Sequence, residues 1–350
     1  MNILTFENIG IRAIAASVPK NIAKIEEQTK FFDERHLKNF IENTGIYERR
    51  VSSVDQTSSD LCCKAAETIF EKTGFDKGEI QALIFVSQTP DYRQPATSII
   101  MQDRLHLRKD IFTQDVNQAC SGFVFGLVSA YSLCNAGLNN VLLCVGDTPS
   151  KFTSPTDSST SLMFGDAGTA CIVSKDIKYG KSYFSFNADG SELHSVNIPA
   201  GGYRKMSSVE TLSLHKDNEG NEKTMEQIHM DGLSVFSYSV RAMATDVKNL
   251  LSYAKVGLDD INTIVLHQAN QFLNNKVSKK LGIDESKTLK SIKHFGNTSA
   301  SSIPLTISFN SNIDINNHSL LFTAIGASFT WGTGLMTIKD MINLGVTELE

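Results

Sequence analysis

The segment NQACSGFVFGLVSAYSLCNAG (117–137) decides the fold class, because it carries the chain from a strand into an apolar helix. DIFTQDV (110–116) directly precedes it and has the pattern of a strand. From Ser121 onward the apolar residues cover almost every side of a helix, and such a helix is buried. Gly137 is placed to end it. The pattern predicts an α/β protein with Cys120 at a strand-to-helix turn, at or just before the N-terminus of a buried helix.

Outward from this segment, apolar runs typical of buried strands occur in pairs about half a chain length apart. Three pairs follow in the same order: EIQALIFVSQ (79–88) with DINTIVLHQ (260–268), VLLCVGD (141–147) with SLLFTAIGA (319–327), and FGDAGTACIV (164–173) with FTWGTGLMTI (329–338). Paired segments in one order indicate a duplicated unit. Helical patterns such as 58–74 alternate with these runs, as in buried sheets covered by helices. We predict two halves packed as one body, residues 1–174 and 175–350.

Composition and charge narrow the functional class. The chain has 350 residues, of which 41% are hydrophobic and 20% charged, the balance of a globular protein. Its net charge of −5 is mild and gives no indication of a nucleic acid or membrane partner. No apolar run reaches the roughly 18 residues needed to span a bilayer. The first residues, MNILTFENIGIRAIAA, lack the features of a secretory signal, so we expect a cytoplasmic protein.

Cys120 is the candidate nucleophile among six cysteines. No pair has CxxC spacing and no Cys/His cluster has zinc spacing, so we expect neither a metal site nor a disulfide framework. A helix N-terminus favours an anion and should lower the pKa of a thiol placed there. The small neighbours Ala119, Ser121 and Gly122 leave room for a substrate. A buried structural cysteine is the alternative, and the other five cysteines keep that interpretation.

Two further segments in the second half offer partners for this thiol. His267 in LHQANQF (266–272) ends a buried strand, where a side chain can face an active-site crevice. Asn297 in FGNTSASSIP (295–304) could point its amide N–H toward a reacting carbonyl. Taken singly, a structural histidine and an asparagine in a turn are the ordinary interpretations. The second half is therefore expected to carry the histidine and the asparagine of the site.

Together these segments resemble the β-ketoacyl-acyl carrier protein synthase III family of thiolase-like condensing enzymes. Six matching pieces span most of the chain in the order of the family: TGIYERR (44–50), QACSGF (118–123), FGDAGTA (164–170), HQAN (267–270), GNTSASSIP (296–304) and FTWGTG (329–334). The resemblance implies a duplicated αβαβα fold in five layers, in agreement with the internal repeat. The Cys-His-Asn set is shared with chalcone synthase-like enzymes, but the GNTSASSIP motif and the short chain favour synthase III.

The resemblance also implies roles for the residues. Cys120 would accept an acyl group from a thioester, and His267 and Asn297 would bind the thioester carbonyl of malonyl-carrier protein as CO₂ leaves. The carbanion would then attack the acyl-Cys carbonyl and give a 3-oxoacyl-carrier protein. Backbone N–H groups of Cys120 and Ala327 would form the oxyanion hole, each contributing about 3–4 kcal/mol. No cofactor or metal is required.

The departures from the family pattern cluster where its members grip coenzyme A. Asn39 and Asn43 stand in place of a common Trp and Arg, and Ser158 and Phe272 in place of two further arginines. Each lost charge-assisted contact to a phosphate could weaken binding by roughly 1.5–3 kcal/mol. We therefore predict that the priming acyl group arrives on a carrier protein or on an unusual thioester.

Some other positions argue against a carrier-bound primer, and others show further departures from the family pattern. The nearby residues Arg49, Arg50 and Arg204 could compensate for the missing cations. The acyl pocket itself also differs, because Gln94 stands near the position where the dimer partner commonly lends a Phe. Ile325 begins the stretch that is usually Phe-Gly-Gly-Gly. These two positions indicate a pocket unlike the acetyl-selective one, but they do not fix the acyl chain. The family implies a homodimer.

A basic segment suggests where a carrier protein would dock. Residues 276–293 hold six lysines against two acidic residues in a chain of net charge −5. Lys276, Lys279 and Lys280 begin this segment. Acyl carrier proteins are acidic, so a basic patch beside the active-site mouth would steer their approach. A solvated helix face is the alternative interpretation.

Two other functions remain open from the sequence. The same acyl-enzyme could pass its acyl group to an alcohol or amine, forming an ester or amide in specialised metabolism. The chain could also be a non-catalytic partner subunit of a heterodimeric synthase. The intact set of Cys120, His267 and Asn297 argues against the second alternative, because an idle subunit has no physical need for all three.

Overall fold

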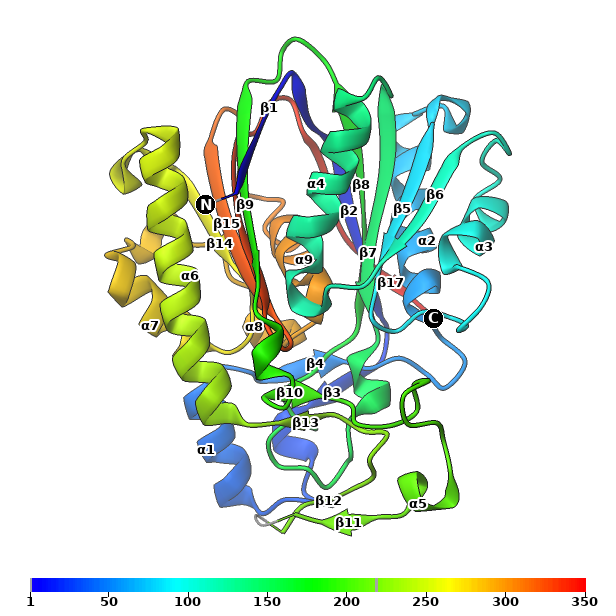
Figure 1. Ribbon diagram of the computed structural model, residues 1–350, viewed down its shortest axis with the longest axis vertical. Coiled ribbons are helices and arrows are strands. Elements are labelled where there is room, and N and C mark those ends of the chain that lie inside the picture. Colours follow the sequence, from blue (N-terminus) through cyan, green and yellow to red (C-terminus); the bar gives the residue numbers. More distant parts are fainter. Residues whose placement is uncertain (1, 218–219) are drawn as a thin grey trace.

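The computed structural model describes residues 2–217 and 220–350 and contains two central sheets (Figure 1). The five-stranded sheet has the order β1 (Ile3–Glu7), β9 (Lys181–Ala188), β16 (Thr330–Thr337), β15 (Ser319–Gly326), β14 (Thr263–Leu266). The six-stranded sheet has the order β17 (Ile342–Leu349), β2 (Ile9–Pro19), β8 (Ala167–Lys175), β7 (Asn140–Asp147), β5 (Ala82–Val86), β6 (Phe112–Val116).

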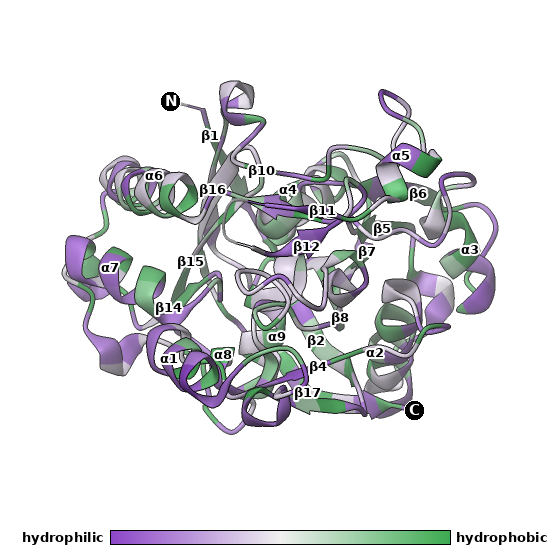
Figure 2. Ribbon diagram, turned by 90° about the horizontal axis from the view of Figure 1, so that it is seen from below, coloured by the Kyte–Doolittle hydropathy of each residue, from purple (hydrophilic) through white to green (hydrophobic). Residues whose placement is uncertain are grey.

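Helices form three further layers around these sheets. The middle layer, between the sheets, contains α4 (Gly122–Asn135) and α9 (Ser302–Phe309). The outer layers hold α2 (Ser58–Thr73) with α3 (Thr97–Arg104) on the six-stranded side, and α6 (Gly232–Ala254) with α7 (Gln271–Leu281) on the other. In Figure 2, α6 and α7 show both hydrophilic and hydrophobic segments, as expected of helices with one exposed face. The predicted five-layer αβαβα order is therefore confirmed.

The strand pairing repeats between the two halves, as the paired sequence segments predicted. In the first half β5 runs parallel to β7, which pairs antiparallel with β8. In the second half β14 runs parallel to β15, which pairs antiparallel with β16. Strands β5, β14, β15 and β16 lie within their apolar runs of the sequence, and β7 and β8 extend one and two residues beyond theirs. The duplicated α/β unit is confirmed by this shared connectivity.

The two ends of the chain depart from a simple division into halves. Strand β1 pairs with β9 in the five-stranded sheet, which is otherwise built from the second half. Strand β17 pairs parallel with β2 in the six-stranded sheet, which is otherwise built from the first half. Each half thus lends its outermost strand to the sheet of the other. The division at residues 174 and 175 stays a prediction.

The middle layer holds the best-buried part of the core. Helix α4 is predominantly apolar and packs against strands of both sheets. Phe123 and Tyr131 of α4 are fully buried and contact Phe322 of β15 and Phe184 of β9, with ring centroids 5.1–5.5 Å apart. Such aromatic contacts join the two halves through the central helix. The prediction of a buried helix after Cys120 is confirmed.

A smaller substructure covers one end of the sheets, at the bottom of Figure 1. It includes α1 (Glu34–Thr44), α5 (Val209–Leu212), α8 (Ile292–Phe295) and the short strand pairs β3 (Ile22–Lys24) with β4 (Glu48–Arg50), β10 (Val196–Asn197) with β13 (His229–Met230), and β11 (His215–Lys216) with β12 (Glu222–Lys223). Lys223 is buried and forms an ion pair with the fully buried Asp157 at 3.2 Å. Among the described residues, no helix is long and apolar enough to cross a membrane.

Candidate active site

One cavity brings together the three residues that the sequence predicted as catalytic. It has a volume of about 190 Å³ and is lined by Cys120, His267 and Asn297. Most of its wall is apolar and includes Phe152, Phe164, Ile228, Val235, Phe236 and Phe329. Its lining contains no Asp, Glu, Lys or Arg, so the cavity fits an uncharged, largely apolar group.

Cys120 lies in the short 3-10 turn η3 (Ala119–Ser121), directly before helix α4. Ala119 has a positive φ of 44°, which turns the chain sharply from strand β6 into the helix. The thiol is partly exposed to the cavity, whereas the other five cysteines are buried. The prediction of a nucleophile at a strand-to-helix turn therefore agrees with the geometry of the chain.

The electrostatic setting of this thiol differs from the sequence prediction. The helix N-terminus was expected to lower the pKa of Cys120. Instead, burial raises the pKa of the thiol to about 12, and the buried carboxylate of Asp147 raises it further, while a contact with Ser299 lowers it. The mostly apolar cavity desolvates the sulfur, and this disfavours the charged thiolate. Cys120 therefore needs a proton acceptor before it can attack a thioester.

His267 follows β14, and its backbone N–H donates to the carbonyl of Thr323 at 2.9 Å. Its side chain is buried, and burial lowers the pKa of the imidazole to about 4, so the ring is neutral near pH 7. Nδ1 lies 2.6 Å from the hydroxyl of Ser302. Among the described residues this nitrogen is the acceptor found for that hydroxyl proton, so Ser302 donates to Nδ1. The ring then carries its own proton on Nε2.

Asn297 sits between α8 and the second 3-10 turn, η8 (Ser299–Ser301). Its side-chain oxygen accepts the backbone N–H of Ser299 at 2.9 Å, which leaves the amide N–H groups for the cavity. The preceding Gly296 has a φ of 63°, and a Cβ there would lie 2.6 Å from the carbonyl oxygen of Met163. The glycine therefore allows the close approach that fixes Asn297 in place.

Comparison with known proteins identifies relatives of this chain. The family described as 3-oxoacyl-[acyl-carrier-protein (ACP)] synthase III matches residues 114–190, and the family of its C-terminal part matches residues 251–338. The chain is 35% identical to β-ketoacyl-[acyl-carrier-protein] synthase III of Chlamydia caviae, over 83% of this chain and 86% of the relative. The chain belongs to the β-ketoacyl-acyl carrier protein synthase III family.

Solved structures agree with this membership in fold. A 3-oxoacyl-(acyl-carrier protein) synthase from Burkholderia xenovorans superimposes with a TM-score of 0.93 at 30% identity, covering 99% of each chain. The synthase III of Pseudomonas aeruginosa gives a TM-score of 0.81 at 26% identity, covering 95% of this chain and 98% of the other. The thiolase-like fold of the synthase III family is therefore the fold of this chain.

The predicted pocket residues of this synthase III member divide into two groups. Ile325 and Ala327 line the cavity. Ala327 directly follows Gly326, whose missing Cβ would lie 3.1 Å from the backbone nitrogen of Cys120. The backbone N–H groups of Cys120 and Ala327 are thus close neighbours in the fold, and their joint role as an oxyanion hole stays a prediction.

Four other predicted pocket residues lie outside the cavity of the described chain. Asn43 is exposed on α1, and Gln94 is exposed in the loop before α3. The backbone N–H of Ser158 donates to the side chain of Asn221 at 3.0 Å, in the covering substructure. Phe272 is 49% exposed at the start of α7 and stacks on Phe236, which does line the cavity. Contacts of these four residues with a substrate stay predictions.

The predicted docking lysines of the synthase III chain lie on the exposed side of α7. Lys276, Lys279 and Lys280 are all exposed. The ammonium group of Lys276 lies 5.3 Å from the ring centroid of Phe272. Because Phe272 stacks on a residue of the cavity wall, this end of α7 adjoins the cavity.

Sequence reasoning missed three residues that surround the triad. Ser299 contacts the sulfur of Cys120, Ser302 binds His267, and Asp147 raises the pKa of Cys120. The two serines lie within the GNTSASSIP motif, so their nearness in sequence to Asn297 was a usable signal. Asp147 offered no such signal, because a carboxylate at the end of a strand does not reveal which turn it will face.

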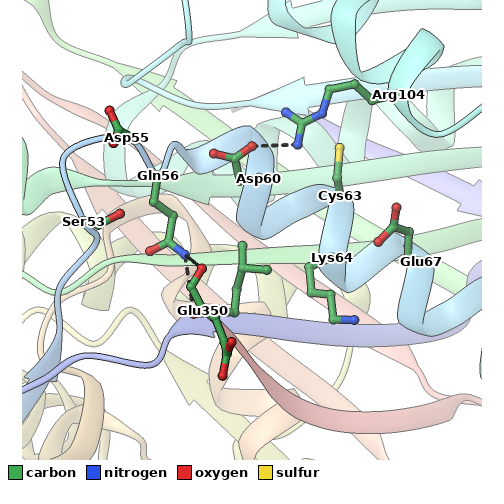
Figure 3. A pocket seen from close by; sticks show the side chains of 10 residues that line it. Ser53, Asp55, Gln56, Asp60, Cys63, Lys64, Glu67, Arg104 and Glu350 are labelled. Atoms are coloured by element: carbon green, nitrogen blue, oxygen red, sulfur yellow. Dashed lines mark hydrogen bonds and ion pairs between the residues drawn. The ribbon is translucent and has the colours of Figure 1, made fainter.

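A second cavity of about 380 Å³ lies away from the triad, beside α2 and β17 (Figure 3). Asp60 and Arg104 form an ion pair at its edge with a 2.6 Å distance. Cys63 lines it, and burial raises the pKa of that thiol to about 12. Its lining contains no histidine or asparagine, so it lacks the partners that Cys120 has.

Proposed function

We propose that this chain is a condensing enzyme that makes a 3-oxoacyl-carrier protein from an acyl thioester and malonyl-carrier protein. The observation that carries the proposal is the single apolar cavity shared by Cys120, His267 and Asn297. Membership of the synthase III family supports the same reaction. Chemistry through a covalent acyl-enzyme divides one difficult step into two easier ones.

In the first half-reaction the Cys120 thiolate attacks the thioester carbonyl of the priming acyl group. The C–S bond to the carrier breaks, and the acyl group remains on Cys120. Backbone N–H groups of Cys120 and Ala327 would stabilise the oxyanion of the tetrahedral intermediate, because the close approach at Gly326 places the two turns together.

In the second half-reaction malonyl-carrier protein enters the same cavity. Loss of CO₂ leaves the electron pair on the α-carbon as an enolate, whose oxygen carries the developing charge. His267 is neutral and donates from Nε2, and Asn297 donates from its amide, so both are suited to hold that oxygen. The carbanion then attacks the acyl-Cys120 carbonyl, and the Cys120 thiolate leaves.

The priming acyl group is proposed to arrive on a carrier protein and not on coenzyme A. The cavity lining has no cation, and two of the arginines that could have replaced the missing ones are engaged elsewhere. Arg49 is buried and donates to the carbonyl of Phe164 at 3.4 Å. Arg50 forms an ion pair with Glu348 at 2.7 Å. Arg204 is exposed and is the remaining candidate of the three.

The carrier protein is proposed to dock on the exposed face of α7 with Lys276, Lys279 and Lys280. This face adjoins the cavity through the stacked pair of Phe236 and Phe272. Acidic carriers would be steered there electrostatically. The opposite charge prevails near α1, where Glu26, Glu27, Glu34 and Glu42 line a shallow depression with Lys38. An acidic carrier would therefore avoid the α1 side.

A homodimer is proposed as the working form. Strand β6 is an edge strand of the six-stranded sheet, and Phe112 on it is 46% exposed. An unpaired edge with an exposed aromatic residue suits strand pairing with a second copy. Gln94, in the loop before α3, would then reach the cavity of the partner subunit instead of its own.

Intact-mass measurement after incubation with acyl thioesters tests these proposals in one experiment. An acyl mass on Cys120 from carrier thioesters and not from coenzyme A thioesters is the expected result. Labelling from acetyl-coenzyme A at low concentration would contradict the carrier-bound donor while leaving the condensing function intact. Absence of an adduct from every donor would instead favour the non-catalytic subunit of a heterodimer.

The acceptor is tested by adding malonyl-carrier protein to the preformed acyl-enzyme. Release of CO₂ together with a 3-oxoacyl product is the expected result. Transfer of the acyl group to an added alcohol or amine, with no decarboxylation, would replace condensation by ester or amide formation.

A further inference from the structure

The reaction described above leaves one buried carboxylate without a role. Asp147 ends strand β7 and has no solvent exposure. One of its oxygens accepts the hydroxyl of Ser87 at 3.0 Å and the backbone N–H of Gln88 at 2.8 Å. The other accepts the backbone N–H of Ala300 at 3.2 Å. Among the described residues the partners found for this carboxylate are these donors and the Thr89 hydroxyl at 3.4 Å, so hydrogen bonds balance its negative charge.

Burial raises the pKa of Asp147 to about 6, and the four groups that donate to it limit the rise. The titratable groups that face it are two thiols. They are Cys62 of α2, whose pKa burial raises well above its ordinary value, and Cys120, and the charge of Asp147 raises the pKa of both thiols. A carboxyl that titrates near neutrality beside a nucleophile has the properties of a general base.

Ser299 lies between this carboxylate and the nucleophile. Its hydroxyl oxygen is 3.6 Å from the sulfur of Cys120 and accepts the side-chain N–H of Gln88 at 2.6 Å. Asp147 accepts the backbone N–H of Ala300, the residue after Ser299, at 3.2 Å, and hydrogen bonding from the Ser299 side chain lowers the pKa of that carboxyl. The φ of 53° at Ser299 and the bond from its N–H to Asn297 hold the hydroxyl in this place.

We propose that Ser299 and Asp147 form a proton relay that deprotonates Cys120. The thiol proton passes to the Ser299 oxygen while the Ser299 proton passes to the Asp147 carboxylate. The site then holds a thiolate and a neutral carboxyl. The thiolate attacks the thioester, and when the C–S bond to the carrier breaks, the departing sulfur takes the proton back from Asp147 through Ser299.

The relay has an electrostatic advantage in this buried site. One negative charge is present before and after the transfer, so no additional ion is desolvated. His267 is not required as the base, because among the described residues the hydrogen bond of the Cys120 sulfur is with Ser299. His267 remains free to donate from Nε2 in the second half-reaction.

The competing explanation is that Asp147 and Ser299 only stabilise the backbone conformation. Two matched control residues distinguish this structural role from a proton relay. Asp166 is also a fully buried carboxylate, bound by Ser52 and Ser150, with a pKa raised by burial. Ser301 is a fully buried serine two residues from Ser299, whose hydroxyl donates to the carbonyl of Thr298 at 2.7 Å.

The experiment measures the rate of single-turnover acylation of Cys120 by intact mass, from pH 5 to 9, with one acyl-carrier thioester. The wild type is expected to gain rate through an apparent pKa near 6 as Asp147 ionises. Asp147→Asn and Ser299→Ala should each lose that limb and fall by about 10²–10³-fold at pH 7. Their double variant should be no slower than either single variant, because relay members act as a unit.

Asp166→Asn and Ser301→Ala should keep the pH profile and stay within about threefold of the wild-type rate. The relay is overturned if Asp147→Asn or Ser299→Ala keeps the limb near pH 6, or if their effects multiply. Thermal melts identify a variant that fails to fold, and Ser299→Ala then decides the question alone. This inference rests on the proposed function for its acylation step: an unacylated wild type would defeat that function, whereas acylation unaffected by the variants would defeat only the relay.

Discussion

The 3-10 turns η3 and η8 contact each other at the cavity and have similar backbones. They differ in whether the backbone N–H of their second residue is free or hydrogen-bonded. Both begin with a positive φ, 44° at Ala119 and 53° at Ser299, and both lead into a buried helix. Their second residues are Cys120 and Ala300. The duplication thus supplies two similar turns, of which one carries the nucleophile and the other carries its support.

The strand that faces each turn explains the difference. Strand β7 ends at Asp147, whose carboxylate accepts the N–H of Ala300. Strand β15 ends at the equivalent place with Gly326, which has no side chain to accept the N–H of Cys120. The backbone N–H of Cys120 is therefore left available for a substrate oxyanion, while that of Ala300 is occupied. The difference between Asp147 and Gly326 at these two strand ends therefore decides which turn has a free backbone N–H for a substrate and which has a bound one.

The largest expected effect comes from exchanging the second residues of the turns. Cys120→Ser should lower the condensation rate by about 10³-fold or more, because the nucleophile is lost. In Cys120→Ala/Ala300→Cys the thiol at position 300 should stay unacylated, since it is outside the cavity and its N–H is bound by Asp147. The rate of 3-oxoacyl product formation checks the first variant, and intact mass after incubation with the acyl donor checks the second. An acylated Cys at 300 would show that the turns are interchangeable.

The second largest effect is expected from adding a side chain at Gly326, where β15 comes close to the backbone of the turn that carries Cys120. In Gly326→Ala the Cβ would lie 2.7 Å from the carbonyl oxygen of Gln118 and 3.1 Å from the nitrogen of Cys120. We expect a loss of about 1–3 kcal/mol in the free energy of unfolding and about 10²-fold in acylation rate. Denaturant titration and intact mass measure the two. Gly180→Ala, where a Cβ meets nothing within 4 Å, should change neither, and an equal loss there would remove the argument.

A third test uses the strand ends, where Ser87 after β5 corresponds to His267 after β14. The unfolded chain protonates His267 near its ordinary pKa of 6.5, but the folded chain does so only near pH 4, because burial disfavours the cation. The unfolded state therefore binds more protons between these values. The contribution of His267 to the free energy of unfolding should fall by about 3 kcal/mol as the pH drops from 6.5 to 4.

Urea titrations at several pH values should show this dependence weakened in His267→Gln. Ser301→Ala should keep it, since the Ser301 hydroxyl donates to the backbone carbonyl of Thr298 and to no titratable group. If His267→Gln and the wild type lose stability in parallel below pH 6.5, the imidazole is not held neutral by burial.

The smallest expected effect concerns the outer helices. Helix α7 carries exposed lysines, whereas α3, which follows the corresponding strand of the first half, ends with Arg104 in an ion pair. Lys279→Glu/Lys280→Glu should raise KM for the carrier substrate by about three- to tenfold at low salt and leave kcat unchanged. Lys109→Glu, at an exposed site beyond α3, is the control. An unchanged KM in the double variant would leave α7 a solvated face.

The sequence predicted local structure well and long-range contacts poorly. The predicted helix at 58–74 is α2, Ser58–Thr73, because apolar periodicity determines such an element locally. The triad could be proposed from its motifs, and the three residues share one cavity. The lowered pKa expected for Cys120 was wrong, since burial depends on packing between the two halves.

The relay could not be predicted for the same reason. Asp147 and Ser299 are more than 150 residues apart in the sequence. The residues around each of them do not indicate that the folded chain will bring the two together. The exchange of β1 and β17 between the sheets was also missed, because strand patterns show which residues are buried and not which sheet receives them.

That exchange of terminal strands affects how the protein forms during synthesis. Strand β17, residues Ile342–Leu349, lies beside β2 in the sheet that the first half otherwise builds. The edge of β2 therefore stays unpaired during synthesis until residues 342–349 have emerged from the ribosome. Pairing across such a sequence distance is slow, and an open edge can capture other strands. Chaperones that shield strand edges should matter more for this chain than for one whose halves close independently.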